Sequence, residues 1–276
     1  MAGTLWVIAT PIGNLEDLSP RARTVLAAVD AVLAEDTRRT RALLASVGIE
    51  RPLLSLHEHN ERKRSNEALA RLQGGESLAL VSDAGTPLIS DPGFRLVRAA
   101  REVGVPVRPV PGPSAAIVAL SVAGIPCERF CFEGFLPAAP IRRKARLSEL
   151  AHETRTMVFF EAPQRIEAML EDAMAVFGER RRACLARELC KLHETLLGPD
   201  LLAIAERLRL DPEQRLGEMT LVVAGLDEPE PRAMAEGKRL YRLLATELPP
   251  ARAAKLAASF TGLPRACFYG GDGDGD

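Results

Sequence analysis

The stretch LVSDAGTPLISDPG, from Leu80 to Gly93, carries more polar and turn-forming residues than a strand-to-helix connection needs. Its two carboxylates, Asp83 and Asp91, stand among two glycines, two prolines, two serines and a threonine. The end formed by Asp91, Pro92 and Gly93 is typical of a helix cap followed by proline in the first turn. The part from Ser82 to Pro87 has no such structural explanation. We therefore predict that it binds a ligand, with Asp83 as its charged contact.

Three other apolar runs end in similar loops, which are TPIGN at 10–14, PGPSAA at 111–116 and EAPQR at 161–165. In open α/β sheets, ligands bind beyond the carboxyl ends of the strands. Glycine lets a ligand approach the backbone closely, and proline fixes the shape of a loop before binding. Ser114 is placed to cap the next helix, whose first N–H groups could bind a carboxylate. The alternative is that Ser114 caps its own helix and does nothing else.

Acidic and basic residues lie side by side in AEDTRRTR, at 34–41. Glu35 and Asp36 could accept a proton in a reaction. The neighbouring Arg38, Arg39 and Arg41 could bind phosphate. The alternative is a helix start with acids in its first turn, which the helix dipole favours.

A second basic cluster, IRRKAR at 141–146, follows the proline-rich stretch EGFLPAAP. Its four basic residues suit contact with a phosphodiester backbone, although a solvated helix face would carry the same residues. Lys191, which follows the apolar run ACLAR, is a further cation that could steer phosphate or an oxyanion.

Short apolar runs alternate with amphipathic helical patterns, which favours an α/β fold with a mostly parallel sheet. A first series predicts strands at 5–9, 31–34, 53–56, 77–81 and 105–110, and a second at 129–135, 156–160, 183–187 and 219–225. A connection at 122–128 separates the two series, and the acidic, proline-rich DEPEPR at 227–232 is typical of a linker. We therefore predict α/β domains at 1–122 and 123–226, a small helical domain at 233–270 and a disordered acidic tail at 271–276.

The composition fits a globular protein rather than a membrane or disulfide-rich one. The chain has 276 residues and 47% hydrophobic content, which allow a sizeable core. Its net charge is -1. The five cysteines are scattered, and His57 and His59 lack an obvious third ligand. We therefore predict free, buried thiols and no metal site. No stretch has the pattern of a signal peptide or a membrane span, so we expect a cytoplasmic protein.

Taken together, these motifs resemble the tetrapyrrole-methylase-like class of S-adenosylmethionine methyltransferases and, within it, the bacterial small-subunit ribosomal RNA methyltransferases. The matching stretches run in order along most of the chain: ATPIGNLEDLSPRA, AEDTRRT, LHEHNE, LVSDAGTPLISDPG, PGPSAAI, FCFEGFLP, ARELCK and GEMTLVV. The resemblance implies two α/β domains with the cofactor in the cleft between them, a small C-terminal helical domain and a homodimer. It also implies methylation of the ribose 2′-hydroxyl of a cytidine in the decoding region of 16S rRNA, with the assembled small subunit as the substrate.

Carried over by position, the resemblance implies cofactor contacts from Pro11, Gly13, Asp83, Ala84, Gly85, Pro87, Ser114, Ala115, Phe160, Glu161, Ala162, Ala186 and Met219. The catalytic candidates are Glu35 or Asp36 as the base and Lys191 as the cation. The RNA-binding candidates are Arg38, Arg39, Arg41, Arg142, Arg143, Lys144 and Arg146. Two alternatives stay open. The first is a methylase of a tetrapyrrole such as a corrin precursor, which the same loops would serve. The second is a non-catalytic RNA-binding assembly factor on the same fold.

Overall fold

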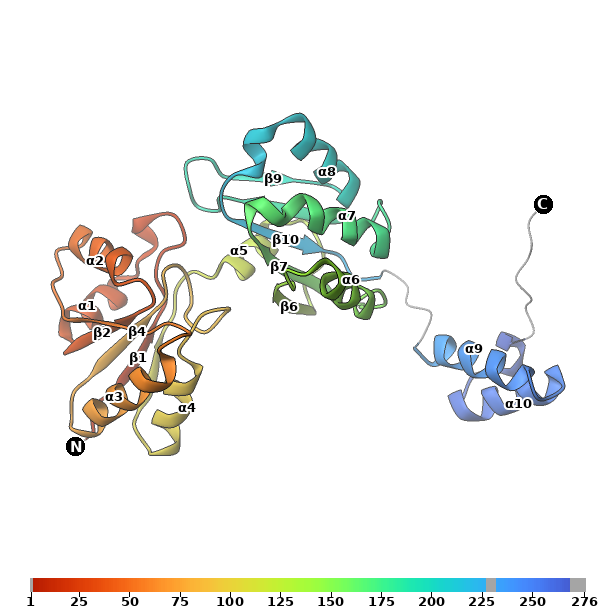
Figure 1. The fold of residues 1–276 in the computed structure, drawn as a ribbon, viewed down its shortest axis with the longest axis horizontal. Coiled ribbons are helices and arrows are strands. Elements are labelled where there is room, and N and C mark those ends of the chain that lie inside the picture. Colours follow the sequence, from red (N-terminus) through yellow and green to blue (C-terminus); the bar gives the residue numbers. More distant parts are fainter. Residues whose placement is uncertain (1, 227–231, 269–276) are drawn as a thin grey trace. The chain divides into compact units, whose positions relative to one another are not determined.

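The computed structural model of the chain describes residues 2–226 and 232–268. Within these residues the chain forms two compact units (Figure 1). The larger unit extends to Ala224, except for His152–Thr154, which belong to the C-terminal unit that begins at Gly225. The predicted acidic tail at 271–276 and most of the predicted linker, residues 227–231, lie outside the described residues.

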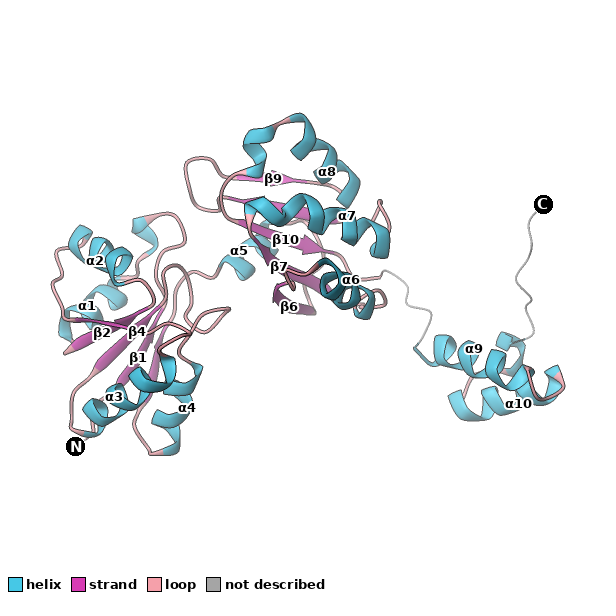
Figure 2. Ribbon diagram, in the orientation of Figure 1, coloured by secondary structure: helices cyan, strands magenta, loops and turns pink. Residues whose placement is uncertain are grey.

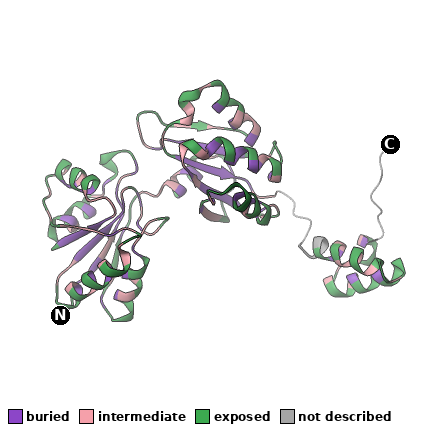
Figure 3. Cartoon of the chain, in the orientation of Figure 1, coloured by how far each residue is buried: buried purple, intermediate pink, exposed green. Residues whose placement is uncertain are grey.

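The first part of the larger unit is a sheet of five parallel strands in the order β3-β2-β4-β1-β5 (Figure 2). The strands are β1 (Leu5–Ile8), β2 (Ala31–Ala34), β3 (Leu53–Ser55), β4 (Leu78–Val81) and β5 (Val107–Val110), with helices α1 (Pro20–Ala28), α2 (Thr37–Ser46), α3 (Glu61–Gln73) and α4 (Phe94–Glu102). Helices α3 and α4 pack on one face of the sheet, and α1 and α2 on the other. Because β2 and β4 are covered on both faces, all their residues are buried (Figure 3).

The second part is a five-stranded mixed sheet in the order β6-β7-β10-β8-β9, in which only β6 and β7 are parallel. Its strands are β6 (Phe130–Phe135), β7 (Thr156–Glu161), β8 (Ala183–Arg187), β9 (Thr195–Leu197) and β10 (Met219–Val223). Helices α6 (Pro140–Glu149), α7 (Ile166–Phe177) and α8 (Leu201–Leu210) share one core with this sheet.

Helix α5 (Ala115–Val122) packs against β7 and β10, through a second core that contains Ala119, Val158 and Val222. The domain boundary predicted at 122 and 123 therefore separates α5 from the sheet on which it packs. The predicted strands end within two residues of the observed ones, but β9 was not predicted.

The C-terminal unit contains α9 (Arg232–Ala245) and α10 (Pro250–Thr261), followed by a short 3-10 turn. Helix α10 ends at Gly262, which adopts a left-handed conformation. Phe268 packs against Ala254 and Ala257, and its ring lies so close to Gly237 that a Cβ there would be 2.6 Å from it. These small residues let the helices approach closely around one aromatic ring.

The prediction of buried thiols is correct only for Cys184, because Cys127 is exposed and the other three cysteines are half-buried. None of the helices within residues 2–226 and 232–268 is both long and apolar enough to cross a membrane.

Candidate active site

The polar loops of the first sheet meet at one edge, because its five strands are parallel. Strand β4 lies between β2 and β1, so the loop after β4 contacts the loops that follow both neighbours. The backbone N–H of Asp36 donates to Asp83 Oδ1 at 2.9 Å, and Thr10 and Gly85 exchange two backbone hydrogen bonds. The Thr86 hydroxyl donates to the carbonyl of Pro113, after β5, at 2.9 Å. The strand order thus assembles one site from four loops.

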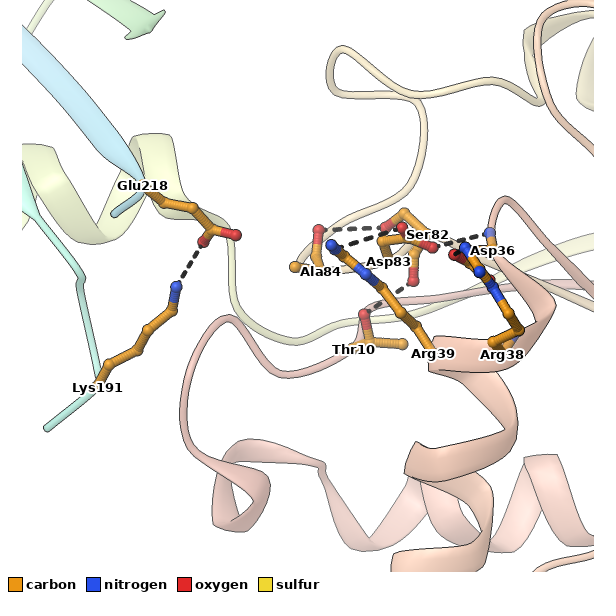
Figure 4. Close-up of polar contacts among 9 residues, drawn as sticks. All are labelled: Thr10, Asp36, Arg38, Arg39, Ser82, Asp83, Ala84, Lys191 and Glu218. Carbon is orange, nitrogen blue, oxygen red and sulfur yellow. Dashed lines mark hydrogen bonds and ion pairs between the residues drawn. The ribbon is translucent and has the colours of Figure 1, made fainter. Parts of the chain in front are cut away.

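Hydroxyl groups hold the loop after β4 in shape (Figure 4). The Thr10 hydroxyl donates to the carbonyl of Ser82 at 3.2 Å, and the Ser82 hydroxyl lies within hydrogen-bonding distance of the carbonyls of Ala84 and Gly85. Gly85 has a φ of +82°, which residues with a side chain rarely adopt. The loop is therefore fixed by its own residues before any ligand binds.

A cavity of about 380 Å³ lies against this loop and is lined by residues of both sheets. Its size lies within the range of small-molecule sites. Most of the predicted cofactor residues line it, namely Asp83, Ala84, Ser114, Ala115, Phe160, Glu161, Ala162, Ala186 and Met219. Pro11, Gly13, Gly85 and Pro87 do not. Ser114 occupies the N-cap position of α5, but its hydroxyl makes no capping hydrogen bond, so the simple capping interpretation is wrong.

Glu161 is a buried carboxylate in the wall of this cavity. Its side chain is 0% exposed, and burial raises its pKa. Oε1 accepts a hydrogen bond from the N–H of Ala162 and lies 3.1 Å from Arg165, whereas Oε2 has no hydrogen-bond partner among the residues that the structure describes. A buried oxygen without a partner destabilises a protein, so the cavity offers an acceptor for an N–H or O–H group of a ligand.

Asp91 was predicted to cap a helix, and this prediction is wrong. Helix α4 begins at Phe94 after an N-cap at Gly93, whose N–H donates to Glu61 Oε1 at 3.0 Å. Asp91 instead lines the cavity. Burial, followed by the negative charges of Glu35 and Asp83, raises the pKa of Asp91 to about 6. A helix cap was predicted because an aspartate followed by proline is a common start of a helix.

Two loops at the cavity contain non-glycine residues with positive φ angles. Leu88 and Ser90 have φ values of 73° and 69°, and Glu188 and Cys190 have values of 51° and 63°. Such residues store conformational strain, which concentrates at functional sites. Both loops contribute lining residues between or beside these positions, so the strain lies at the cavity wall.

The carboxylates Glu35 and Asp36, both predicted as bases, lie just outside the cavity lining. Asp36 is the N-cap of α2 and pairs with Arg38 at 2.7 Å. Hydrogen bonds from the Arg38 side chain and backbone lower the pKa of Asp36, which makes it a weak base. Glu35 is half-buried, and burial followed by the charge of Asp83 raises its pKa. The helix-start interpretation is therefore correct for Asp36.

Lys191, the predicted cation, is held by two carboxylates. Its ammonium group lies 2.9 Å from Glu188 and 3.0 Å from Glu218, as Figure 4 shows for the second contact. Burial lowers the pKa of Lys191, but the hydrogen bonds to these two carboxylates outweigh burial and raise it overall. Lys191 does not line the cavity, although Glu218 does. Its charge is thus largely neutralised before a substrate arrives.

The three predicted RNA-binding arginines of α2 are exposed. Arg38 is 87% exposed despite its ion pair with Asp36. Arg39 is 65% exposed, lies 3.5 Å from Asp83 and lines the cavity. This basic surface therefore borders the cavity directly, through Arg39.

The basic cluster of α6 is mostly paired with acidic residues. Arg143 is buried and lies 2.7 Å from Asp172, so the prediction that it binds RNA is wrong. Its ion pair instead joins α6 to α7. Lys144 lies 3.4 Å from the same carboxylate, and Arg146 pairs with Glu133 and Glu149. Within the described residues, Arg142 is the member of this cluster for which we find no ion pair.

Comparisons with known proteins agree along nearly the whole chain. Residues 4–204 match the family described as Tetrapyrrole (Corrin/Porphyrin) Methylases, and residues 232–269 match the family described as RsmI C-terminal HTH domain. The chain is 56% identical over 269 residues to "Ribosomal RNA small subunit methyltransferase I" of Xylella fastidiosa, covering 98% of both chains. The protein of the same name from Pseudomonas aeruginosa is 52% identical, over 97% of this chain and 96% of the relative.

Solved structures share the fold of the larger part of the chain. The uroporphyrin-III C-methyltransferase of Thermus thermophilus, complexed with S-adenosyl homocysteine, aligns with a TM-score of 0.55 and 16% identity. The alignment covers 80% of this chain and 96% of that one.

Proposed function

The chain belongs to the tetrapyrrole methylase family, and on this premise we propose that it methylates small-subunit ribosomal RNA with S-adenosylmethionine as the methyl donor. The acceptor in this proposal is the ribose 2′-hydroxyl of a cytidine in the decoding region of 16S rRNA. The observation that carries the proposal is the high identity, over nearly the whole chain, to relatives named as ribosomal RNA small subunit methyltransferases.

The cavity fits the proposed cofactor. S-adenosylmethionine supplies, when bound, a methyl group activated by a positive sulfonium. Asp83 and Asp91 provide negative charge at the cavity wall, which favours a cationic ligand. Glu161 provides a buried acceptor without a partner, which suits a hydroxyl or amino group. The rest of the wall is largely apolar and includes Phe160 and Met219, so it would exclude water around the ligand.

Among the carboxylates that line the cavity, Asp91 has the pKa best suited to accept the proton of the ribose hydroxyl. An alcohol is a poor nucleophile until its proton moves, and a general base works best when its pKa lies near the working pH. With a pKa of about 6, Asp91 is mostly ionised at neutral pH and is still a stronger base than an ordinary aspartate. Glu35 then acts through its charge, which contributes to the raised pKa of Asp91.

The exposed arginines of α2 would bind the RNA backbone beside the cavity, and Arg142 would add a contact from α6. Aromatic residues make up only 4% of the chain, so few of them are available to stack on single-stranded bases. An assembled small subunit, which presents the target in a fixed shape, is therefore the proposed substrate. The proposal also includes a homodimer that acts in the cytoplasm, where such subunits occur.

The test is methyl transfer from labelled S-adenosylmethionine to small subunits, naked rRNA and tetrapyrroles in parallel. The proposal expects label in the subunit, recovered as 2′-O-methylcytidine. Label in a tetrapyrrole would establish the alternative methylase activity. Binding of subunits without any transfer, together with no affinity for the cofactor in calorimetry, would identify a non-catalytic assembly factor.

A further inference from the structure

We propose that a second groove, beside the cofactor cavity, binds the target nucleotide of the RNA. This inference rests on the proposed function, because it names the subsite in which that substrate would be held. It assigns a ligand to a surface whose residues have otherwise been considered for cofactor binding or as part of a general basic patch.

The groove has a volume of about 320 Å³ and lies between the loop after β1 and one side of α2. Pro11, Gly13 and Leu15 form the loop side, and Ala42, Leu43 and Ser46 form most of the helix side. Together with Arg39, these helix residues follow the spacing i, i+3, i+4 and i+7, which places them on one face. Ala42 and Ser46 are exposed small residues, so the groove is open to solvent where they line it.

The groove and the cavity meet at two charged residues, since Arg39 and Asp83 line both. A ligand in the groove would therefore lie next to a cofactor in the cavity, as methyl transfer requires. Asp83 already accepts the Asp36 N–H and lies 3.5 Å from Arg39 Nη1. Within the described residues, the remaining N–H groups of Arg39 have no hydrogen-bond partner that we find, so they are available to a phosphate.

The chemistry of the walls suits a nucleotide. Pro11, Leu15 and Leu43 offer apolar surface for the faces of a base, and Leu15 is 51% exposed. Arg39 at one end provides a guanidinium for the attached phosphate. The volume of the groove lies at the lower end of the range for small-ligand sites, which begins at about 300 Å³. An apolar slot that ends in a cation matches a base attached to a ribose phosphate.

The surroundings of Gly13 explain why this residue of the groove wall is glycine. A Cβ at Gly13 would lie 2.6 Å from Lys191 Cγ and 2.7 Å from the carbonyl oxygen of Leu189. Glycine is therefore needed here so that the loop after β1 can pack against the loop after β8. This packing fixes the groove wall, and it explains Gly13 without any contact to the cofactor.

The test uses Ala42→Phe, which places a ring in the groove from an exposed helix position. The matched control is Ala45→Phe, because Ala45 is also exposed on α2 but lines neither the groove nor the cavity. Ser46→Phe is a second groove variant in case Ala42→Phe does not fold. For each protein, filter binding measures affinity for small ribosomal subunits, calorimetry measures affinity for S-adenosylmethionine, and labelled methyl transfer gives kcat/KM.

We expect Ala42→Phe and Ser46→Phe to reduce kcat/KM and subunit affinity at least tenfold, with cofactor affinity within twofold of the wild type. Ala45→Phe should stay within twofold for all three quantities. Equal behaviour of the groove and control variants would overturn the inference, as would a tenfold loss of cofactor affinity with unchanged subunit affinity. If the wild type transfers no methyl group, the proposed function fails, and subunit affinity alone still decides the role of the groove.

Discussion

Replacing Asp91 with asparagine should stabilise the protein at neutral pH and at the same time reduce methyl transfer. The pKa of Asp91 is raised from 3.8 to about 6, so the folded protein binds its proton more tightly than the unfolded chain does. Stability is then lost as the pH rises from about 4 to about 6, because the unfolded chain releases this proton first. Asparagine has no proton to release and avoids this loss.

The magnitude follows from the size of the pKa change. A change of this size corresponds to about 3 kcal/mol if the group is fully shielded from water. Asp91 is only partly buried, so solvent screening reduces the expected gain to about 1 kcal/mol. For a domain of this size, that gain raises Tm by about 2–4 °C. Loss of a general base should lower kcat by a factor of about 10²–10⁴.

The assay is thermal unfolding of the wild type and Asp91→Asn between pH 4.5 and 8, with kcat measured across the same range. The difference in Tm should grow with pH and level off above about pH 6. The wild-type kcat should rise through pH 6, and the residual activity of the variant should not. A variant that is less stable at every pH would refute the idea that the charge of Asp91 destabilises the fold. An unchanged kcat would remove Asp91 from the mechanism.

Three further predictions concern charged groups. Glu35→Gln should move the acidic limb of the kcat profile to lower pH, because the charge that helps to raise the pKa of Asp91 is removed; an unshifted profile would contradict this coupling. Glu61→Ala should cost about 1 kcal/mol in urea unfolding, since this carboxylate accepts two N–H groups at the start of α4; no loss would show that α4 does not need this cap. Arg143→Ala should lower the free energy of unfolding by about 3 kcal/mol, because the buried Asp172 would keep only the exposed Lys144 as a partner. Combining it with Asp172→Leu should recover part of this loss. If Arg143 were instead an exposed surface residue, Arg143→Ala would cause almost no loss of stability.

Most of the fold could be predicted because its signals are local. Apolar runs of four to six residues correspond to strands buried on both faces, and Ser19 with Pro20 starts α1 as predicted. Strand β9 has half-buried residues and lies at a sheet edge, so it lacks a strong apolar signal. The packing of α5 on the second sheet could not be read from the sequence either, because its apolar residues fit either sheet equally well.

The loops of the site could be predicted, but the roles of their charged residues could not. The density of glycine, proline and hydroxyl residues identifies the loop after β4 and its neighbours without any information on tertiary contacts. Whether a carboxylate caps a helix, pairs with an arginine or faces a cavity depends on residues distant in the chain. Asp36 and Asp91 both stand within three residues of the start of a helix, yet Asp36 caps α2, and the start of α4 is capped by Glu61 from another helix.

At the carboxyl edge of the first sheet, the pKa values of Glu35 and Asp91 are raised by burial and by the nearby charge of Asp83. Asp83 accepts a backbone N–H and lies beside Arg39, whereas the charges of Asp83 and Glu35 raise the pKa of Asp91. Folding alone gives no reason to keep this repulsion, because uncharged residues would fill the same space at lower cost. A cationic ligand in the adjoining cavity would offset it, and a base with a raised pKa would exploit it. The repulsion is therefore better explained by the chemistry of methyl transfer than by the stability of the fold.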